Sequence, residues 1–189
     1  AFQATHGAVM IKASAGGGGR GMRAVEDADR LEEAYARCQS EAMAAFGSGE
    51  VYLERLIRKA RHIEVQIVGD RHGAISHLWE RECTIQRRNQ KLIEVAPSPS
   101  LSEALRARII EAAKQLAAAA QYDNLGTFEF LVDDEADGND DRFAFIEANP
   151  RLQVEHTVTE QVLGIDLVGT QMAIAAGATL ADLGLRQAD

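Results

Sequence analysis

The sequence lacks the features that mark disulfide-rich and membrane proteins. Its only cysteines are Cys38 and Cys83, which form no CxxC pair, so they provide no disulfide framework and no metal framework. Their scarcity indicates a reducing compartment. The longest apolar runs fall well short of the ~20 residues that span a membrane, and no charged-then-apolar leader opens the chain. We therefore expect no membrane partner and a cytoplasmic location.

Basic residues are in the minority. The chain has 20 Lys and Arg against 29 Asp and Glu, a formal net charge of −9. This balance argues against a general nucleic-acid-binding protein, which is normally basic. The 189 residues suffice for one large or two small domains, and the apolar content of 46% is that of a globular protein. Because the chain begins with Ala1 rather than Met, we expect a fragment of a longer protein; a trimmed complete domain is the alternative.

Glycine is concentrated in one short segment. A strand expected over Gly7–Ala13 is followed by Ser14–Met22 (SAGGGGRGM), in which five glycines fall within six residues. Ordering such a run costs much entropy, but it allows the backbone to approach a phosphate group closely. The segment matches neither the Walker A pattern nor GxGxxG. Lys12 before the run and Arg20 inside it favour a phosphate-binding loop over a flexible linker.

Hydrophobic periodicity and cap residues predict the other elements. Helices are expected over Glu26–Phe46 (N-cap Asp27, stop at Gly47), Glu103–Gln121 (N-cap Ser102) and Thr157–Ala176. Strands are expected over Val51–Leu56, His62–Asp70, Ala74–Glu80 and Leu125–Val132, and from Phe143 onward. The acidic turn Asp133–Arg142 misses the EF-hand spacing, so we expect a solvated hairpin loop and no calcium site there.

The stretch from Phe143 to Glu160 carries the densest polar pattern. Phe143 and Phe145 begin a strand, and acid, amide, cation, amide and acid follow at every second position (Glu147, Asn149, Arg151, Gln153 and Glu155). Extended backbone sends alternate side chains to one face. The preceding hairpin sets Glu129, a carboxylate in an apolar strand, beside Glu147, and Mg²⁺ prefers such oxygen ligands. The pattern indicates a site for metal, phosphate and a small anion; a polar strand end with a salt bridge is the alternative.

A second polar segment is basic inside an acidic protein. Four cations fall within eleven residues (Arg81, Arg87, Arg88 and Lys91). They indicate a local anion site. The alternative, which charge alone leaves open, is that neighbouring acids neutralise them structurally (Glu80, Glu82 and Glu94).

Five signatures carry a family resemblance. They are MIKASAGGGGRGMR (Met10–Arg23), RHIEVQI (Arg61–Ile67), ERECTIQRRNQKLIEVAPSP (Glu80–Pro99), GTFEFL (Gly126–Leu131) and FIEANPRLQVEHTVTE (Phe145–Glu160). In this order, and over nearly the whole chain, they resemble the ATP-grasp region of biotin carboxylase, the ATP-using component of the acyl-CoA and pyruvate carboxylases. The resemblance implies an α+β ATP-grasp fold, incomplete at both ends, with two α+β subdomains and mainly antiparallel sheets. Residues 1–56 would form part of the lid and residues 57–189 part of the carboxy-terminal subdomain.

The resemblance also implies a role for each matching residue. ATP would be bound by the phosphate-contacting Lys12, Gly16, Gly17, Gly18 and Gly19, the adenine-cradling Glu54, Arg55, Leu56 and Ile57, and by His62, Gln86, Asn89, Glu129 and Glu147. Mg²⁺ or Mn²⁺ would be held by Glu129, Glu147 and Asn149, and bicarbonate by Lys91, Arg151, Gln153, Val154 and Glu155. Arg151, Glu155 and Lys91 would be catalytic. At Asn89 the family often has histidine, which weakens that one assignment.

The implied reaction is ATP-dependent carboxylation of biotin on a carrier domain. Mg-ATP would phosphorylate bicarbonate to carboxyphosphate, with Glu155 taking the bicarbonate proton and Arg151 holding the anion and steadying the biotin enolate. The partners would be the biotin carrier domain, the carboxyltransferase component and a second copy of the parent, in the cytoplasm or, in a eukaryote, the mitochondrial matrix. A lysine and a biotin-site arginine that the family supplies from other segments are missing here, so we expect little or no activity from this chain alone.

Two other readings stay open. One is an ATP-grasp ligase of the carbamoyl-phosphate synthetase kind, which shares the metal acids and the phosphorylation of bicarbonate. The other is a catalytically silent nucleotide-binding module. QRRNQK and RLQVEHTVTE favour the biotin enzyme over the first, and the intact Glu129, Glu147, Arg151 and Glu155 argue against the second.

Overall fold

The computed structural model describes residues 8–16, 21–88, 90–134 and 143–185. Four of the expected ligand-binding residues (Gly17, Gly18, Gly19 and Asn89), with Arg20 and most of the acidic turn Asp133–Arg142, lie outside this part of the chain. The chain forms two compact units, Ala1–Arg58 and Lys59–Asp189. Their identity as the lid and the carboxy-terminal subdomain stays a prediction, and each unit is described by itself.

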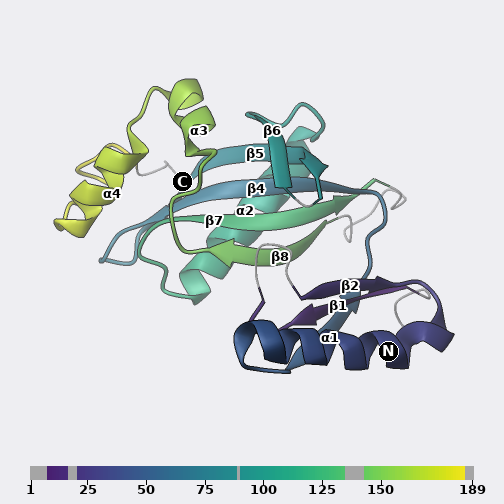
Figure 1. Cartoon of the computed structure of the whole chain (residues 1–189). Helices are drawn as coiled ribbons and strands as arrows, with labels where there is room; N and C mark the ends of the chain where they lie inside the picture. The colour runs from purple at the N-terminus through teal and green to yellow at the C-terminus, as the bar shows by residue number, and fades with distance from the viewer. Residues whose placement is uncertain (1–7, 17–20, 89, 135–142, 186–189) are drawn as a thin grey trace. The chain divides into compact units, whose positions relative to one another are not determined.

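The smaller unit is a three-stranded antiparallel sheet with one helix (Figure 1). The strand order is β2 (Met22–Val25), β1 (Val9–Ala13), β3 (Val51–Arg55), and α1 (Leu31–Phe46) follows a short 3-10 helix, η2 (Ala28–Arg30). Alternate residues of β1 are buried, and Val9 and Ile11 pack with Val25 and Cys38 beneath α1. The strand β2 was not expected, because its four residues follow directly on the glycine run and are too few to show a period.

The predicted start of the first helix was too early. Asp27 caps η2 rather than α1: its Oδ1 accepts a hydrogen bond from the backbone N–H of Asp29 at 3.0 Å. The α-helix then begins at Leu31, with no side-chain cap from Arg30. Its predicted stop at Gly47 is confirmed, because Gly47 takes a left-handed φ of 72° and its N–H donates to Met43 O.

The larger unit is a five-stranded antiparallel sheet in the order β6–β5–β4–β7–β8. The strands are β4 (Ala60–Gly69), β5 (Ile75–Arg87), β6 (Gln90–Val95), β7 (Asn124–Asp133) and β8 (Phe143–Asn149). The helix α2 (Glu103–Ala119) lies across one face of this sheet (Figure 1). There Ile63, Val65 and Ile67 pack with Ile109 and with alternate residues of β7. The second expected N-cap is confirmed: Ser102 Oγ accepts from Leu105 N–H at 3.3 Å.

The single helix expected over Thr157–Ala176 is wrong. The chain forms α3 (His156–Leu163) and α4 (Leu167–Ala175) instead. Gly164, with φ 68°, ends α3, and Asp166 caps α4 by accepting from Gly169 N–H at 2.7 Å. The break lets Leu167 and Ile174 pack with Leu180 in a second core on the sheet face opposite α2. None of the described helices is long and apolar enough to cross a membrane.

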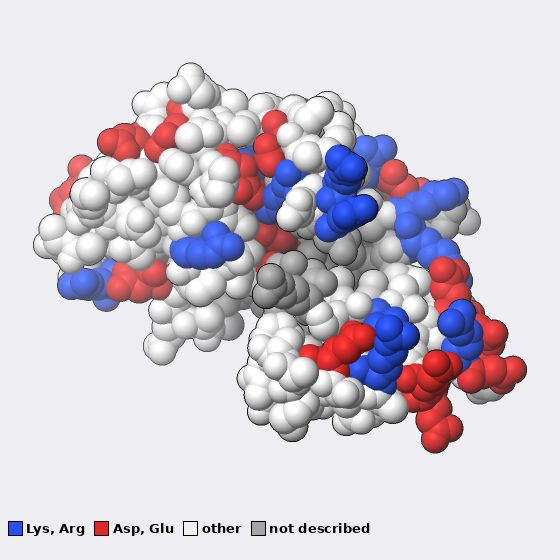
Figure 2. All heavy atoms as spheres, viewed as in Figure 1, with Lys and Arg blue, Asp and Glu red and all other residues white. Residues whose placement is uncertain are grey.

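The antiparallel α+β architecture that the family resemblance implied is confirmed in both units. Acidic and basic side chains both occur on the visible surface of each unit (Figure 2), as the mixed composition implies. The strand β5 is longer than its predicted span Ala74–Glu80, and it contains a register shift opposite Val65–Ile67. Its extension carries the basic run into the hairpin with β6.

Candidate functional site

The candidate site lies on the sheet face opposite α2. Ile63 and Val65 of β4 face the helix, so the alternate residues His62 and Glu64 face the other way. Glu129 of β7 is the direct partner of Glu64 and joins it on that face. The sequence folds this way because β4 and β7 alternate apolar and polar side chains while both of their faces are covered.

A register shift brings β8 into the site. Phe130 pairs with Phe145, but Glu129 pairs with Glu147, so one residue of β8 is passed over between them. Phe145 stays with the aromatic cluster, its ring 5.7 Å from that of Phe130, while Glu147 moves to the face of Glu129. The expected pairing of Glu129 with Glu147 is confirmed. The hairpin predicted this pairing, but the register shift was not expected; without it, strict alternation from Phe145 would put Glu147 on the face of the phenylalanines.

The expected extended run to Glu155 is also wrong. The strand ends at Asn149, and Pro150 opens a segment of bend and turn before α3. Proline has no N–H to continue the ladder. Gln153 and Glu155 nevertheless return to the site, because the turn folds the chain back over β7.

Glu129 is the point where these side chains meet. Its Oε1 accepts hydrogen bonds from Asn149 Nδ2 at 3.0 Å, Gln153 Nε2 at 2.9 Å and Lys91 Nζ at 3.1 Å. His62 Nε2 lies 2.8 Å from its Oε2. Gln86 in turn holds His62, with its Nε2 2.7 Å from His62 Nδ1. A carboxylate that is only 3% exposed is therefore matched by donors on every side.

Lys91 joins three carboxylates. Its ammonium group also donates to Glu64 and to Glu155, both buried. Burial lowers the pKa of Lys91, but the charges of Glu64 and Glu129 and the hydrogen bonds of Glu155 and Glu64 outweigh it and raise the pKa well above its ordinary value. Burial raises the pKa of Glu155, but the hydrogen bond from Lys91, a backbone hydrogen bond and the charges of Lys91 and Arg81 together lower it below its ordinary value. Glu155 therefore stays ionised and able to accept a proton.

Arg81 is the centre of a buried hydrogen-bond network beneath the site, and the sequence did not predict this network. Arg81 and Glu64 are both fully buried, and Arg81 Nε donates to Glu64 Oε1. The other guanidinium nitrogens donate to Gln66 (3.0 Å), Thr159 (2.8 Å) and Thr127 (3.4 Å). The sequence signal that could have indicated this network is the position of Glu64 and Gln66 at alternate residues of a strand whose other face is entirely aliphatic.

Two residues of the basic run have carboxylate partners, but these are not the neighbouring acids that the structural alternative named, and the anion site stays a prediction. Arg81 and Lys91 meet carboxylates of the site, whereas Arg87 and Arg88 are exposed at the hairpin end. Two of the three acids expected as neutralising neighbours have other partners: Glu80 accepts from Arg106 at 2.7 Å and Glu82 from Arg61 at 3.2 Å.

Arg151 is the expected residue that stays apart. It is exposed, and its guanidinium donates to Leu152 O at 3.3 Å and to Asn149 Oδ1 at 3.5 Å, with neither bond reaching Glu129 or Glu155. Val154 is 91% exposed.

The expected nucleotide residues of the smaller unit lie on β1 and β3. Lys12 forms an ion pair with Glu54 at 2.6 Å, and Gly16 N–H donates to Ala13 O. Arg55, Leu56 and Ile57 follow at the end of β3.

The donor set fits a hard divalent cation. Asn149 Nδ2 lies 3.0 Å from Glu129 and 3.4 Å from Glu147, so the three expected metal ligands are together. His62, Glu64 and Glu129 also place one ligand atom each within 4.8 Å of one another, but imidazole is not a preferred Mg²⁺ ligand. A third group contains Cys83. Burial, and then the charge of Glu64, raises the pKa of Cys83 so far that no thiolate forms near neutral pH.

Acid should weaken the larger unit through Glu129. Burial raises its pKa, but His62, Lys91 and Gln153 outweigh burial and lower the pKa from 4.5 to about 2. The ionised form therefore stabilises the fold above about pH 4.5, and this contribution, about 3 kcal/mol, is lost as the pH falls towards 2.

Melting temperatures between pH 6 and pH 3, without divalent metal, measure this effect. We expect Glu129→Gln to melt lower at pH 6 and to lose less stability on acidification than the unaltered chain. Glu111→Gln, at an exposed position of α2, should reproduce the unaltered slope. Equal slopes for Glu129→Gln and the unaltered chain would contradict the assignment.

Comparisons with known proteins agree with this geometry. Residues 2–183 match the family described as the carbamoyl-phosphate synthase L chain, ATP binding domain. Pyruvate carboxylase of Aspergillus niger is 52% identical over 188 residues, covering 99% of this chain and 15% of that protein. Pyruvate carboxylase of Staphylococcus aureus is 56% identical over 172 residues, covering 91% of this chain and 14% of that protein. The chain thus spans about 15% of the length of these curated relatives.

Solved structures give the same result. A biotin carboxylase complex from Campylobacter jejuni superposes with a TM-score of 0.86 at 50% identity, covering 94% of this chain and 39% of that chain. The biotin carboxylase domain of 2-oxoglutarate carboxylase from Hydrogenobacter thermophilus, in complex with MgADP, ADP and bicarbonate, also has a TM-score of 0.86, at 44% identity, covering 95% and 38% of the two chains.

Proposed function

The chain belongs to the family of carbamoyl-phosphate synthase L chain ATP-binding domains, and it corresponds to part of a biotin carboxylase region. From this premise we propose that it contributes to ATP-dependent carboxylation of biotin. The observation that carries the proposal is the cluster of Lys91 with Glu64, Glu129 and Glu155 beside Asn149 and Glu147. It combines oxygen ligands for Mg-ATP with an ionised base and a cation in one place.

The residues of this cluster suit the transfer of the γ-phosphoryl group to bicarbonate. Glu129, Glu147 and Asn149 would hold Mg²⁺ or Mn²⁺, which neutralises the charge on the phosphate oxygens when bound. Glu155 would take the proton of bicarbonate while a bicarbonate oxygen attacks the γ-phosphorus of ATP. This step forms carboxyphosphate and releases ADP. Lys91, already placed between the acids, would stabilise the charge that develops.

Arg151 needs to move for its proposed role. Its exposed guanidinium donates only to nearby chain atoms, and the longest of these bonds, 3.5 Å, is weak. We infer that it turns to grip bicarbonate by paired hydrogen bonds when the substrate is present. Gln153 and the exposed Val154 backbone would complete the anion site. Carboxyphosphate would then release CO₂ to the N1 atom of carrier-bound biotin.

The partners belong to the same proposal. The 2-oxoglutarate carboxylase neighbour is described with MgADP and bicarbonate, which supports these ligands here. The relatives in sequence are pyruvate carboxylases, so a biotin carrier domain, a carboxyltransferase component and a homo-oligomeric parent are the expected partners, in the cytoplasm or the mitochondrial matrix.

A chimera tests the proposal without the flanking segments of the native protein. This chain would replace the corresponding segment of the Campylobacter jejuni biotin carboxylase, to which it is 50% identical. We expect ADP release that requires bicarbonate and rises with free biotin, while the isolated chain stays at background.

Two outcomes would reject the proposal. Ammonia-dependent, biotin-independent turnover would support the carbamoyl-phosphate synthetase reading. A folded chimera that binds Mg-ATP without turnover would support the silent module.

A further inference from the structure

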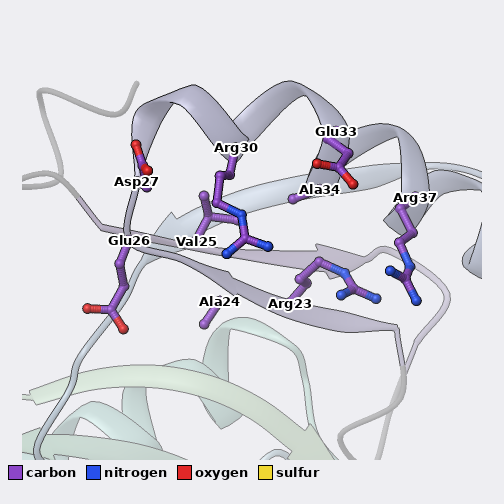
Figure 3. A pocket seen from close by; sticks show the side chains of 9 residues that line it. All are labelled: Arg23, Ala24, Val25, Glu26, Asp27, Arg30, Glu33, Ala34 and Arg37. Carbon is purple, nitrogen blue, oxygen red and sulfur yellow. The ribbon is translucent and has the colours of Figure 1, made fainter.

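The smaller unit contains a hollow that has no part in the proposed reaction. It lies between β2 and the first half of α1 and has a volume of about 270 Å³ (Figure 3). Arg30, the last residue of η2, lies on the same side of the helical segment as Ala34 and Arg37 of α1, because the three are spaced by four and three residues. The small side chain of Ala34 leaves the space open, whereas Ala24, between Arg23 and Val25 on β2, turns its side chain to the other face of the sheet.

Three guanidinium groups point into this hollow. Figure 3 shows Arg30 and Arg37 reaching in from the helical side and Arg23 from β2. Glu41 fixes two of them: Arg23 Nη2 donates to both of its oxygens at 2.9 and 3.0 Å, and Arg37 Nε donates to it at 3.1 Å. This arrangement holds two like charges close together and leaves their other N–H groups available.

Two acids at the rim of the hollow, Glu26 and Asp27, form no described ion pair with its arginines. Glu26 accepts from Arg58 at 2.9 Å, and Asp27 accepts from the backbone of Asp29 at 3.0 Å. Figure 3 shows both carboxylates on the side away from Arg37. Glu33, on α1 between Arg30 and Arg37, is the one acid of the rim left near them.

Two donors in the hollow lack an acceptor. The exposed guanidinium of Arg30 makes no hydrogen bond or ion pair with any residue that the structure describes; only the backbone N–H of this residue donates, to Asp27 O at 3.1 Å. Arg23 Nε is buried and likewise has no partner there. A buried N–H without an acceptor destabilises the fold, and an anion in the hollow would satisfy it.

The hollow is separate from the expected nucleotide residues of the same unit. Arg23 pairs with Ile11, so both face α1. Lys12 is the next residue along β1 and faces the opposite side, where it pairs with Glu54. Phosphate bound by Lys12 is therefore on the other face of the sheet.

We propose that the hollow binds a small anion with at least two negative charges, carried by phosphate or carboxylate groups, with Arg23, Arg30 and Arg37 as its ligands. The planar guanidinium group binds both kinds of oxyanion through paired hydrogen bonds. The site is independent of the proposed carboxylation chemistry, since none of its residues belongs to that cluster.

Titration of the 189-residue chain with pyrophosphate and, separately, citrate tests the proposal. Amide chemical shifts are followed by NMR at low salt without Mg²⁺, because screening weakens such binding at higher ionic strength. We expect saturable shifts at Ala24, Val25 and Ala34. Arg30→Gln should weaken binding about tenfold, the loss of one charge-assisted contact. This variant should fold, because the Arg30 side chain has no described partner.

Two controls separate the hollow from other anion sites. Arg71→Gln removes an exposed arginine of the larger unit, which lies 3.6 Å from Asp123, and should titrate like the unaltered chain. Lys12→Gln should also leave the shifts at Ala24 and Ala34 in place. The proposal is overturned if Arg30→Gln binds as tightly as the unaltered chain, or if the shifts are confined to Lys12 and Gly16. Preference for pyrophosphate or for citrate would identify the oxyanion, and either preference supports the site.

Discussion

Replacing Arg81 with methionine is expected to destabilise the larger unit by about 3–5 kcal/mol, the usual effect of removing one partner of a buried ion pair. Arg81 and Glu64 are both 0% exposed, and the guanidinium makes four side-chain contacts in addition to its packing. Methionine fills similar volume but leaves the Glu64 carboxylate with Lys91 alone. Urea unfolding of the chain, followed by far-UV circular dichroism, measures the change.

A matched set of variants shows whether the effect comes from charge. Arg71→Met removes an exposed arginine that is 3.6 Å from Asp123, and should change stability by less than about 0.5 kcal/mol. The double variant Arg81→Met, Glu64→Leu removes both buried charges and should recover part of the loss, because an apolar pair can replace a buried ion pair. A loss below about 1 kcal/mol for Arg81→Met would mean that water or a neighbouring donor compensates Glu64.

Local pattern predicted most of the elements in this chain. Hydrophobic periodicity predicted the strand β4, and Ser102 and Gly47 correctly marked the start of α2 and the end of α1. Prediction from local pattern failed at positions where one residue changes the direction or the register of the backbone. Gly164 in the left-handed region divides the last helix, and the register shift before Glu147 changes the face of β8. Neither is visible as a period, because each depends on a pairing partner or on packing further along the chain.

The candidate site was predictable in its residues but only partly in their contacts. Glu129, Glu147, Asn149 and Gln153 lie together as expected. The sequence predicted Glu155 on an extended strand, whereas it lies in a turn and accepts a hydrogen bond from Lys91. Glu64 was not predicted, and Arg81 was predicted only as one of four cations of an anion site, since the buried pair depends on both faces of β4 being covered, which is a property of the assembled unit.

These buried groups give Lys91 its position. Arg81 holds one oxygen of Glu64, and Lys91 donates to the other. The ammonium group is thereby kept between Glu64, Glu129 and Glu155. We infer that Arg81 acts through Glu64 as a positioning residue, so its loss should affect the geometry of Lys91 as well as stability.

In the Campylobacter jejuni chimera, Glu155→Gln is expected to lower bicarbonate-dependent ADP release about 10²–10⁴-fold, the usual contribution of a positioned base. The amide keeps the size of the side chain and can still accept a hydrogen bond from Lys91, but it cannot take the bicarbonate proton. Because Glu155 contacts Lys91 and no other described side chain by hydrogen bond or ion pair, Mg-ATP affinity should change little. Initial rates of ADP release and nucleotide titration separate the two effects.

The pH dependence distinguishes a base from a merely structural acid. Burial raises the pKa of Glu155, but the hydrogen bond and charge of Lys91, a backbone hydrogen bond and the charge of Arg81 together lower it below its ordinary value, so the unaltered chimera should keep Glu155 ionised at neutral pH. Glu111→Gln on the exposed side of α2 should leave both rate and affinity unchanged. If Glu155→Gln retains turnover within about threefold, too little to account for a base, or if it loses nucleotide binding in parallel with rate, then Glu155 only anchors Lys91 and the bicarbonate proton leaves by another route.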